Sequence, residues 1–177
     1  ELNNTNYSNY TANEMLNKLV GLQEIKEKVE EFENYIKFIK KAEEQNLQIP
    51  NPNLNMIFTG NPGTGKTTVA RIIAKILFDI GMLHENKLVE VERKDLVAGY
   101  VGQTASKTAE VIERAMGGVL FIDEAYTLYQ ENNSGSDFGG EAIATLIKAM
   151  EDHKGEFVVI FAGYKREMSK FLNINSG

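Results

Sequence analysis

The sequence predicts a single α/β domain built on a parallel β-sheet that carries helices on both faces. Short apolar runs that suit strands alternate along the chain with segments of helical period, which is the order typical of parallel sheets. Runs such as VLFID and FVVIFAG are apolar at consecutive positions, as expected of strands that are buried on both faces. The chain has 177 residues and is 42% hydrophobic, which is enough to form one sizeable core.

The first element that we expect is a long helix after a polar start. Residues 1–15 begin with the asparagine-rich run ELNNTNYSNY and are expected to be frayed, so the folded domain is expected over residues 16–177. From Leu22 onward, apolar residues return at helical spacing. This helix should end near Gln45, because the prolines of IPNPN cannot continue it.

The remaining elements alternate between strands and helices. The run KLVEVE alternates apolar and polar residues and predicts a strand with one covered face, whereas VLFI and FVVIFA are continuously apolar. We expect strands at residues 54–59, 87–92, 119–123 and 157–163, and helices around residues 69–77, 106–116 and 141–151.

Composition argues against several classes of protein. The net charge of −6 is unfavourable for a general nucleic-acid-binding surface. The chain contains no cysteine and so offers no disulfide or thiolate metal site. His84 and His153 lie far apart beside ordinary helix residues, and we interpret both as surface or packing residues. No apolar run is long enough to span a membrane and no signal peptide is visible, so we expect a cytoplasmic protein without membrane contact.

A glycine-rich segment, GNPGTGKTT, follows the first expected strand and precedes a helix. It matches the pattern G-x-x-x-x-G-K-[ST] in the strand–loop–helix context that this pattern requires. Glycines let backbone amides curl around phosphate oxygens, while Lys66 can reach the β- and γ-phosphates and the Thr67 hydroxyl can bind Mg²⁺. We call residues 60–67 the phosphate loop, and we expect nucleotide contacts from Gly60, Asn61, Pro62, Gly63, Thr64, Gly65, Lys66, Thr67 and Thr68.

Two adjacent carboxylates, Asp123 and Glu124, close the apolar run VLFID. On their own they could simply end a strand with charge. Because they follow a phosphate loop, we interpret Asp123 as a Mg²⁺ ligand acting through the ion's water shell. We interpret Glu124 as the catalytic group that polarises the attacking water, with Lys66 as the second catalytic group. Neighbouring carboxylates with separate roles favour ATP hydrolysis, so the expected cofactors are ATP and Mg²⁺.

Three segments together resemble the AAA+ ATPases: GNPGTGKTTVARIIAKIL, VGQTASKTAEVIERAMGGVLFIDEAY and VVIFAGYK. More narrowly, they resemble the CbxX/CfqX group, which includes red-type Rubisco activases and the stage V sporulation protein K. The resemblance covers nearly the whole chain from about Leu16 and implies the three-layer fold of the P-loop NTPases. It also implies that LVGLQEIKEKV encloses adenine, with Val20 and Gly21 at its base; alternatively, Gly21 is only a turn before a helix.

The resemblance gives a role to the segment GYVG, in which an aromatic and a β-branched residue stand between two glycines. In AAA+ proteins an aromatic–hydrophobic–glycine triplet lines the central pore of a ring, usually of six subunits. Tyr100, Val101 and Gly102 fall at that place, where they could grip an extended polypeptide; alternatively, Tyr100 folds back onto its own domain. Residues 130–142 correspond in position to a second pore-facing loop, or else form a polar connector.

The resemblance places sensor 1, a polar group that reads the γ-phosphate, at Tyr164 and Lys165, although asparagine is more usual there. In related proteins an arginine finger, a fifth strand and a small helical lid follow a turn like that in FLNINSG, so we expect these parts to be absent before Gly177. The strand before the phosphate loop should then lie at a sheet edge. ATP turnover by this chain should be weak, because none of its arginines matches the finger position: Arg71, Arg93, Arg114 and Arg166.

We therefore expect a Mg²⁺-dependent ATPase that remodels or threads a protein substrate through the pore of a homo-oligomeric ring, usually a hexamer, in the manner of a chaperone. A composition rich in lysine, asparagine and isoleucine slightly favours a sporulation-type role over a Rubisco-activase role. Two other classes stay open: a nucleic-acid motor or clamp loader with the same core, and an ATP-gated scaffold that does not hydrolyse ATP. The acidic charge and the GYVG segment argue against the nucleic-acid motor.

Overall fold

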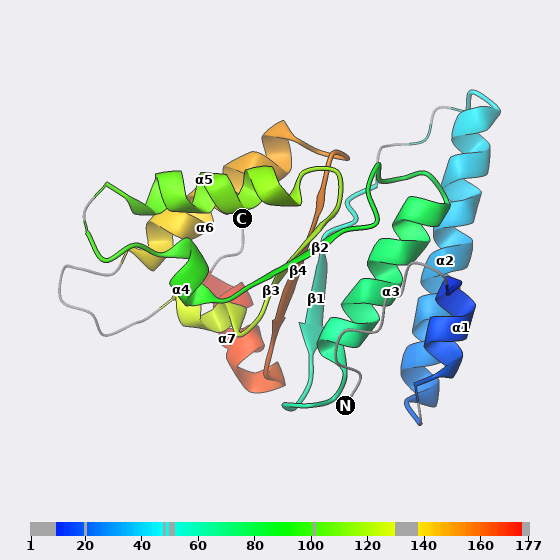
Figure 1. Ribbon diagram of the computed structural model, residues 1–177, viewed down its shortest axis with the longest axis horizontal. Coiled ribbons are helices and arrows are strands. Elements are labelled where there is room, and N and C mark those ends of the chain that lie inside the picture. The colour runs from blue at the N-terminus through cyan, green and yellow to red at the C-terminus, as the bar shows by residue number, and fades with distance from the viewer. Residues whose placement is uncertain are drawn as a thin grey trace.

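The computed structural model describes residues 10–19, 21–47, 49, 52–100, 102–129 and 138–174. Within these residues, helices flank a four-stranded β-sheet on both faces (Figure 1). Along the chain the elements are α1 (Ala12–Asn17), α2 (Gln23–Glu44), β1 (Met56–Thr59), α3 (Lys66–Asp79), β2 (Leu88–Val91), α4 (Arg93–Leu96), α5 (Thr104–Ala115), β3 (Val119–Ile122), the 3₁₀ helix η2 (Ala125–Leu128), α6 (Gly139–Asp152), β4 (Val158–Gly163) and α7 (Lys165–Ile174).

The sheet is parallel throughout, and its strand order is β1-β4-β3-β2. This confirms the prediction of a parallel sheet with helices on both faces. Among the described strands β1, which leads into the phosphate loop, lies at an edge, as the sequence predicted. Its residue Ile57 is 44% exposed, whereas every residue of β3 is buried. The strand that carries the phosphate loop is therefore less covered than the strands in the middle of the sheet.

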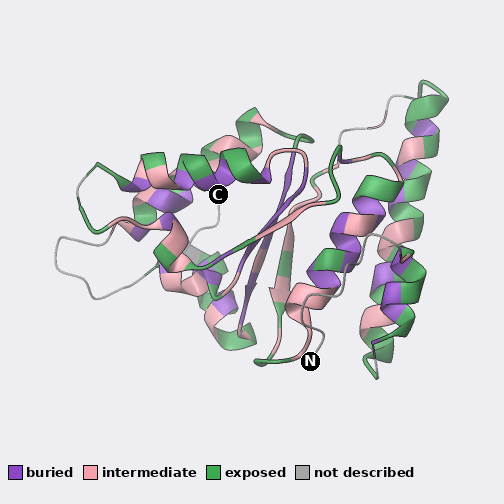
Figure 2. Cartoon of the chain, in the orientation of Figure 1, coloured by how far each residue is buried: buried purple, intermediate pink, exposed green. Residues whose placement is uncertain are grey.

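The sheet separates two apolar cores because successive side chains of a strand point to opposite faces. In β3, Val119 and Phe121 join the core formed with α1, α2 and α3. Leu120 and Ile122 join the core formed with α5, α6 and α7. Figure 2 shows the two central strands as buried along most of their length, between helices whose outer faces are exposed. The continuous apolar runs of the sequence thus correspond to strands covered on both sides.

The helices at α2, α3, α5 and α6 lie where the sequence predicted them, with ends that differ by a few residues. The sequence did not predict α4, η2 and α7. Helix α7 packs on the sheet through Met168 and Phe171, which are buried in the second core. No helix in the described part of the chain has both the length and the apolar character needed to cross a membrane.

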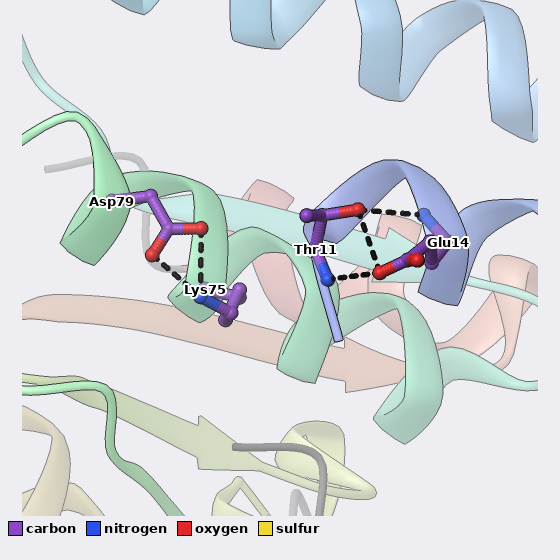
Figure 3. A network of polar contacts seen from close by, with 4 residues as sticks. All are labelled: Thr11, Glu14, Lys75 and Asp79. Carbon is purple, nitrogen blue, oxygen red and sulfur yellow. Dashed lines mark hydrogen bonds and ion pairs between the residues drawn. The ribbon is translucent and has the colours of Figure 1, made fainter. Parts of the chain in front are cut away.

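The prediction of a frayed segment over residues 1–15 is wrong for its last residues, while residues 1–9 lie outside the described ranges. Helix α1 begins at Ala12 with a capping box: the Thr11 hydroxyl oxygen accepts from the Glu14 amide (3.2 Å), and a Glu14 carboxylate oxygen accepts from the Thr11 amide (2.7 Å) (Figure 3). Met15 and Leu16 are buried in the core that α1 shares with α3. Local capping and apolar burial therefore order a segment that its polar composition suggested would fray.

Candidate functional site

A pocket of about 340 Å³ opens at the carboxyl ends of the strands. In parallel sheets these ends meet at one edge, which is where ligands usually bind. The pocket combines residues that the sequence assigned separately to phosphate binding, metal binding and catalysis, together with the end of β4. Its lining consists of Pro62, Gly63, Gly65, Lys66, Thr67, Asp123, Glu124, Gly163 and Tyr164.

Two glycines set the backbone path of the phosphate loop. Gly63 has φ +70° and Gly65 has φ +83°, a left-handed conformation that residues with a Cβ rarely adopt. A Cβ at either position would meet no atom within 4 Å, so the requirement for glycine here is conformational rather than steric. The loop runs directly into the N-terminus of α3, where free amides and the helix dipole favour an anion.

The other end of the phosphate loop is held in place by short contacts. The Gly60 amide donates to the Gly163 carbonyl at 3.2 Å, which joins the loop to the end of β4. The Thr64 hydroxyl donates to the Asn61 carbonyl at 2.8 Å. A Cβ on Gly60 would lie 2.9 Å from the Thr64 hydroxyl oxygen, so this close approach requires glycine. Gly60, Asn61 and Thr64 therefore shape the loop and are not among the residues that line the pocket.

Lys66 lies over its own loop. Its ammonium group donates to the carbonyls of Gly60 (3.1 Å) and Asn61 (3.0 Å). These acceptors are neutral, and a phosphate oxygen would be a stronger acceptor because it is charged. These contacts hold the ammonium group against its own loop, and Lys66 is one of the residues that line the pocket. Thr68, the last residue of the predicted nucleotide contacts, lies one position further along α3 than Thr67 and outside the pocket lining.

The oxygen atoms beside Lys66 suit a small hard cation. Thr67 supplies a hydroxyl from the first turn of α3, and Asp123 supplies a carboxylate after β3, both in the lining of the same pocket. Mg²⁺ prefers oxygen ligands and commonly takes one or two protein groups together with substrate phosphates. Among the described residues no group of three or more His, Cys, Asp or Glu side chains could hold a metal ion by itself. The hydroxyl of Thr67 and the carboxylate of Asp123 are the types of ligand that fit a Mg²⁺ whose other ligands come from phosphate and water.

Glu124 has an unusual backbone conformation for a residue with a side chain. Its φ is 47° and its ψ is 43°, in the left-handed region. The following turn supports this conformation, because the Thr127 hydroxyl (2.7 Å) and the Thr127 amide (2.8 Å) both donate to the Glu124 carbonyl. The Glu124 amide in turn donates to an Asp123 carboxylate oxygen at 2.9 Å. Strained residues of this kind cluster at functional sites, and here the strain places an exposed carboxylate in the pocket lining.

Two tyrosines meet beside the last residue of β4: Tyr126 on η2 and Tyr164 directly after β4. The centroids of their rings are 5.7 Å apart, and a Cβ on Gly163 would come within 2.7 Å of the Tyr126 ring. Burial, followed by the negative charge of Glu124, raises the pKa of Tyr126 to about 12, so its hydroxyl stays protonated near neutral pH. Of the two residues predicted as sensor 1, Tyr164 lines the pocket, while Lys165 begins α7 and is not among the lining residues.

The structure does not bring the predicted adenine contacts into the pocket. Val20 lies outside the described residues. Gly21 has φ +74° and lies two residues before the start of α2, but it is not among the residues that line the pocket. The contact between this segment and adenine therefore stays a prediction.

The segment with Tyr100 lies between α4 and α5, and hydrogen bonds join the residues on its two sides. The Ala98 amide donates to the Thr104 hydroxyl (3.0 Å), and the Thr108 hydroxyl donates to the Leu96 carbonyl (3.0 Å). Both threonines are fully buried, whereas Tyr100 is 74% exposed. Gly102 has a left-handed φ of +78°, and Val101 lies outside the described residues, as do residues 130–137 of the second candidate loop.

Glu90, on β2, contacts the site and was not recognised in the sequence. The Thr67 hydroxyl donates to one Glu90 carboxylate oxygen at 3.2 Å, and the Arg71 guanidinium lies 3.6 Å from the other. In the sequence Glu90 is only a polar position in an alternating strand. Its nearness to Thr67 arises because β2 and α3 come together in space, which local sequence patterns do not encode.

The sequence pattern of the ATPase family associated with various cellular activities (AAA) matches residues 56–173 of this chain. The stage V sporulation protein K of Bacillus subtilis (strain 168) is 49% identical over 162 residues, which are 92% of this chain and 50% of that protein. The chloroplastic ribulose bisphosphate carboxylase/oxygenase activase of Cyanidioschyzon merolae is 47% identical over 160 residues, 90% of this chain and 54% of that protein. The chain thus spans about half the length of these two relatives.

The chain is also similar to a part of a longer protein and to a part of a solved structure. The ESX-1 secretion system protein EccA1 of Mycolicibacterium smegmatis is 45% identical over 163 residues, which are 92% of this chain but 28% of that protein. Among solved structures, the AAA domain of FIGL-1 in complex with ADP superposes with a TM-score of 0.57 at 21% identity, covering 85% of this chain and 49% of that one. This structural likeness concerns the fold.

Proposed function

The chain belongs to the AAA family of ATPases. We propose that it binds ATP with Mg²⁺ in the pocket at the carboxyl ends of its strands and hydrolyses the bond between the β- and γ-phosphates. The observation that supports this most strongly is the composition of that pocket. One cavity of about 340 Å³ combines the phosphate loop, the Thr67 hydroxyl and the adjacent carboxylates of Asp123 and Glu124. These are the groups that phosphoryl transfer from a nucleotide to water requires.

In the proposed reaction each residue has a separate task. The amides of the phosphate loop and the Lys66 ammonium hold the phosphate oxygens and stabilise the charge that develops on them. Thr67 would hold Mg²⁺ through its hydroxyl and Asp123 through the ion's water shell, and the ion would supply positive charge that offsets the negative charge of the phosphates. The exposed Glu124 carboxylate orients a water molecule and accepts its proton as the water attacks the γ-phosphorus. The bond from this phosphorus to the β–γ bridging oxygen breaks, so that ADP leaves with that oxygen and inorganic phosphate is released. Tyr164, which lines the pocket, is the candidate sensor of the γ-phosphate.

We propose that turnover by this chain alone is slow. Among the described residues that line the pocket there is no arginine. An arginine finger contributes about 10³–10⁵ to the rate in related phosphoryl transfer reactions, and it can be supplied by a neighbouring subunit.

The substrate that we propose is an extended polypeptide gripped by Tyr100. A highly exposed aromatic ring on a segment with a fixed base can contact apolar and backbone groups without reading a sequence. Relatives named for sporulation, Rubisco activation and secretion suggest that the same core serves different protein clients, and we do not assign the client. A cytoplasmic location also stays a prediction.

Ring assembly is expected to depend on nucleotide. If the described core carries the ring interfaces, sedimentation velocity on this chain should detect monomers without nucleotide and a species of about hexamer size with ATP and Mg²⁺. A monomer under both conditions would contradict assembly through these residues alone.

Replacing Lys66 with alanine tests nucleotide binding itself. We expect the affinity for a fluorescent ATP analogue to fall about 10- to 100-fold, since hydrogen bonds to charged groups contribute about 1.5–3 kcal/mol. The matched control is Lys148→Ala, which removes the same charge from an exposed position of α6 outside the pocket lining and should leave the affinity unchanged. Equal affinities for the unchanged chain and the Lys66→Ala variant would contradict the proposed site.

Measurements on the unchanged chain also distinguish the proposed ATPase from a nucleic-acid motor and from an ATP-gated scaffold. A nucleic-acid motor would bind DNA with an affinity that falls steeply as salt concentration rises. An ATP-gated scaffold would bind ATP as strongly as the proposed ATPase but would release no phosphate.

A further inference from the structure

Glu90 is a carboxylate that the proposed reaction does not use, and it lies against the proposed Mg²⁺ ligand. The Thr67 hydroxyl donates a hydrogen bond to a Glu90 carboxylate oxygen at 3.2 Å. The second carboxylate oxygen lies 3.6 Å from the Arg71 guanidinium, one helical turn after Thr67 on α3. The Glu90 side chain is 43% exposed, so burial does not explain the arrangement.

The pairing of β2 in the sheet places Glu90 beside Thr67. Strand β2 pairs with β3 in parallel register, and Glu90 lies opposite Phe121. The Asp123 amide donates to the carbonyl of Val91, the next residue of β2, at 2.9 Å. The end of β2 is therefore tied to the backbone of the proposed metal ligand Asp123, while its Glu90 side chain contacts the other ligand, Thr67.

The direction of the Thr67 hydrogen bond matters for metal binding. A hydroxyl has one proton and two acceptor lone pairs, and only a lone pair can bind a cation. When Glu90 accepts the hydrogen bond, the O–H bond of Thr67 points toward Glu90, and the lone pairs of the hydroxyl oxygen are left free for the metal. Groups that orient metal ligands in this way commonly change metal affinity 10- to 100-fold when they are removed.

We propose that Glu90 is a positioning residue of the Mg²⁺ site: it accepts the hydrogen bond from the Thr67 hydroxyl and thereby presents the hydroxyl oxygen to the Mg²⁺ that would enter with ATP. Arg71 assists by holding the second carboxylate oxygen, which keeps Glu90 turned toward Thr67. The inference rests on the proposed function, because it assumes that Mg²⁺ and nucleotide bind in this pocket.

The test compares Glu90→Ala and Glu90→Gln with the unchanged chain. Binding of a fluorescent ATP analogue is titrated with Mg²⁺ and is also measured in EDTA. In Glu90→Ala we expect the Mg²⁺ concentration at half-saturation to rise about tenfold or more. Affinity for the analogue in EDTA should be unchanged or slightly higher, because a negative charge near the phosphates is gone. Glu90→Gln keeps an oxygen that can accept the hydrogen bond from Thr67, so its rise in the Mg²⁺ concentration at half-saturation should be clearly smaller than that of the alanine variant.

The matched control is Glu110→Ala, which removes the same charge from an exposed position of α5 and should not change the Mg²⁺ dependence. A Mg²⁺ half-saturation in Glu90→Ala equal to that of the unchanged chain would overturn the inference. An equal loss of affinity with Mg²⁺ and in EDTA would also overturn it, since that pattern indicates general damage to the pocket. Failure of the unchanged chain to bind the analogue with Mg²⁺ would instead refute the proposed function.

Discussion

Glu124→Gln is expected to lower the rate of ATP hydrolysis at least about 10²-fold while the affinity for ATP with Mg²⁺ stays within a few-fold, since a positioned general base contributes about 10²–10⁴ to a rate. Glutamine has nearly the same shape as glutamate but cannot accept the proton of the attacking water. The side chain is exposed in the pocket lining, so the substitution leaves no buried gap. Single-turnover measurements with excess protein check the rate even where steady-state turnover is slow.

Glu113→Gln is the control for this substitution, because it makes the same change at an exposed position of α5, outside the pocket lining. Hydrolysis at an unchanged rate in Glu124→Gln would exclude Glu124 as the base. Loss of nucleotide binding together with hydrolysis would indicate that the strained turn had collapsed. An unchanged chain that binds ATP and shows no hydrolysis above the Lys66→Ala background would support the ATP-gated scaffold instead.

Tyr100→Ala is expected to lower the affinity of the ATP-bound assembly for an unstructured polypeptide by more than about 100-fold. A single exposed aromatic anchor is commonly worth about 2 kcal/mol at an interface, and a ring would lose one such anchor from each subunit. Fluorescence anisotropy of a labelled unstructured polypeptide, measured with the Glu124→Gln variant to hold ATP in place, gives the affinity. Tyr100→Phe should bind as the unchanged residue does, because it keeps the ring.

A second exposed tyrosine provides the comparison that this experiment needs. Tyr35 on α2 is 49% exposed, and Tyr35→Ala should leave polypeptide binding unchanged. ATP affinity should be equal in both tyrosine variants, because neither residue lines the nucleotide pocket. An affinity for the polypeptide in Tyr100→Ala equal to that of the unchanged residue would refute the proposal that Tyr100 binds the polypeptide.

The strands and the phosphate loop could be predicted from sequence because their patterns are local. Continuous apolar runs identified β3 and β4, and the spacing from Gly60 to Thr67 identified the loop and the start of α3. Both kinds of pattern depend on neighbours along the chain. The edge position of β1 was expected from the family resemblance rather than from the composition of the strand.

Other features were missed for physical reasons. The capping-box pair Thr11 and Glu14 was present in the sequence, but the polar composition around it outweighed the signal. The contact between Glu90 and Thr67 joins a strand to a helix, so neither local pattern contains it. The raised pKa of Tyr126 likewise depends on burial and on charges that come together only in the fold.

The left-handed backbone of Glu124 has a consequence for how the protein can change. A non-glycine residue in that conformation costs about 1–2 kcal/mol, so Glu124 lowers the free energy of unfolding of the chain by about that amount. Glycine or asparagine would tolerate the same backbone with less strain, but neither has a carboxylate. Selection for thermal stability alone would therefore tend to replace the residue on which hydrolysis is proposed to depend, whereas selection for turnover retains it at a cost in stability.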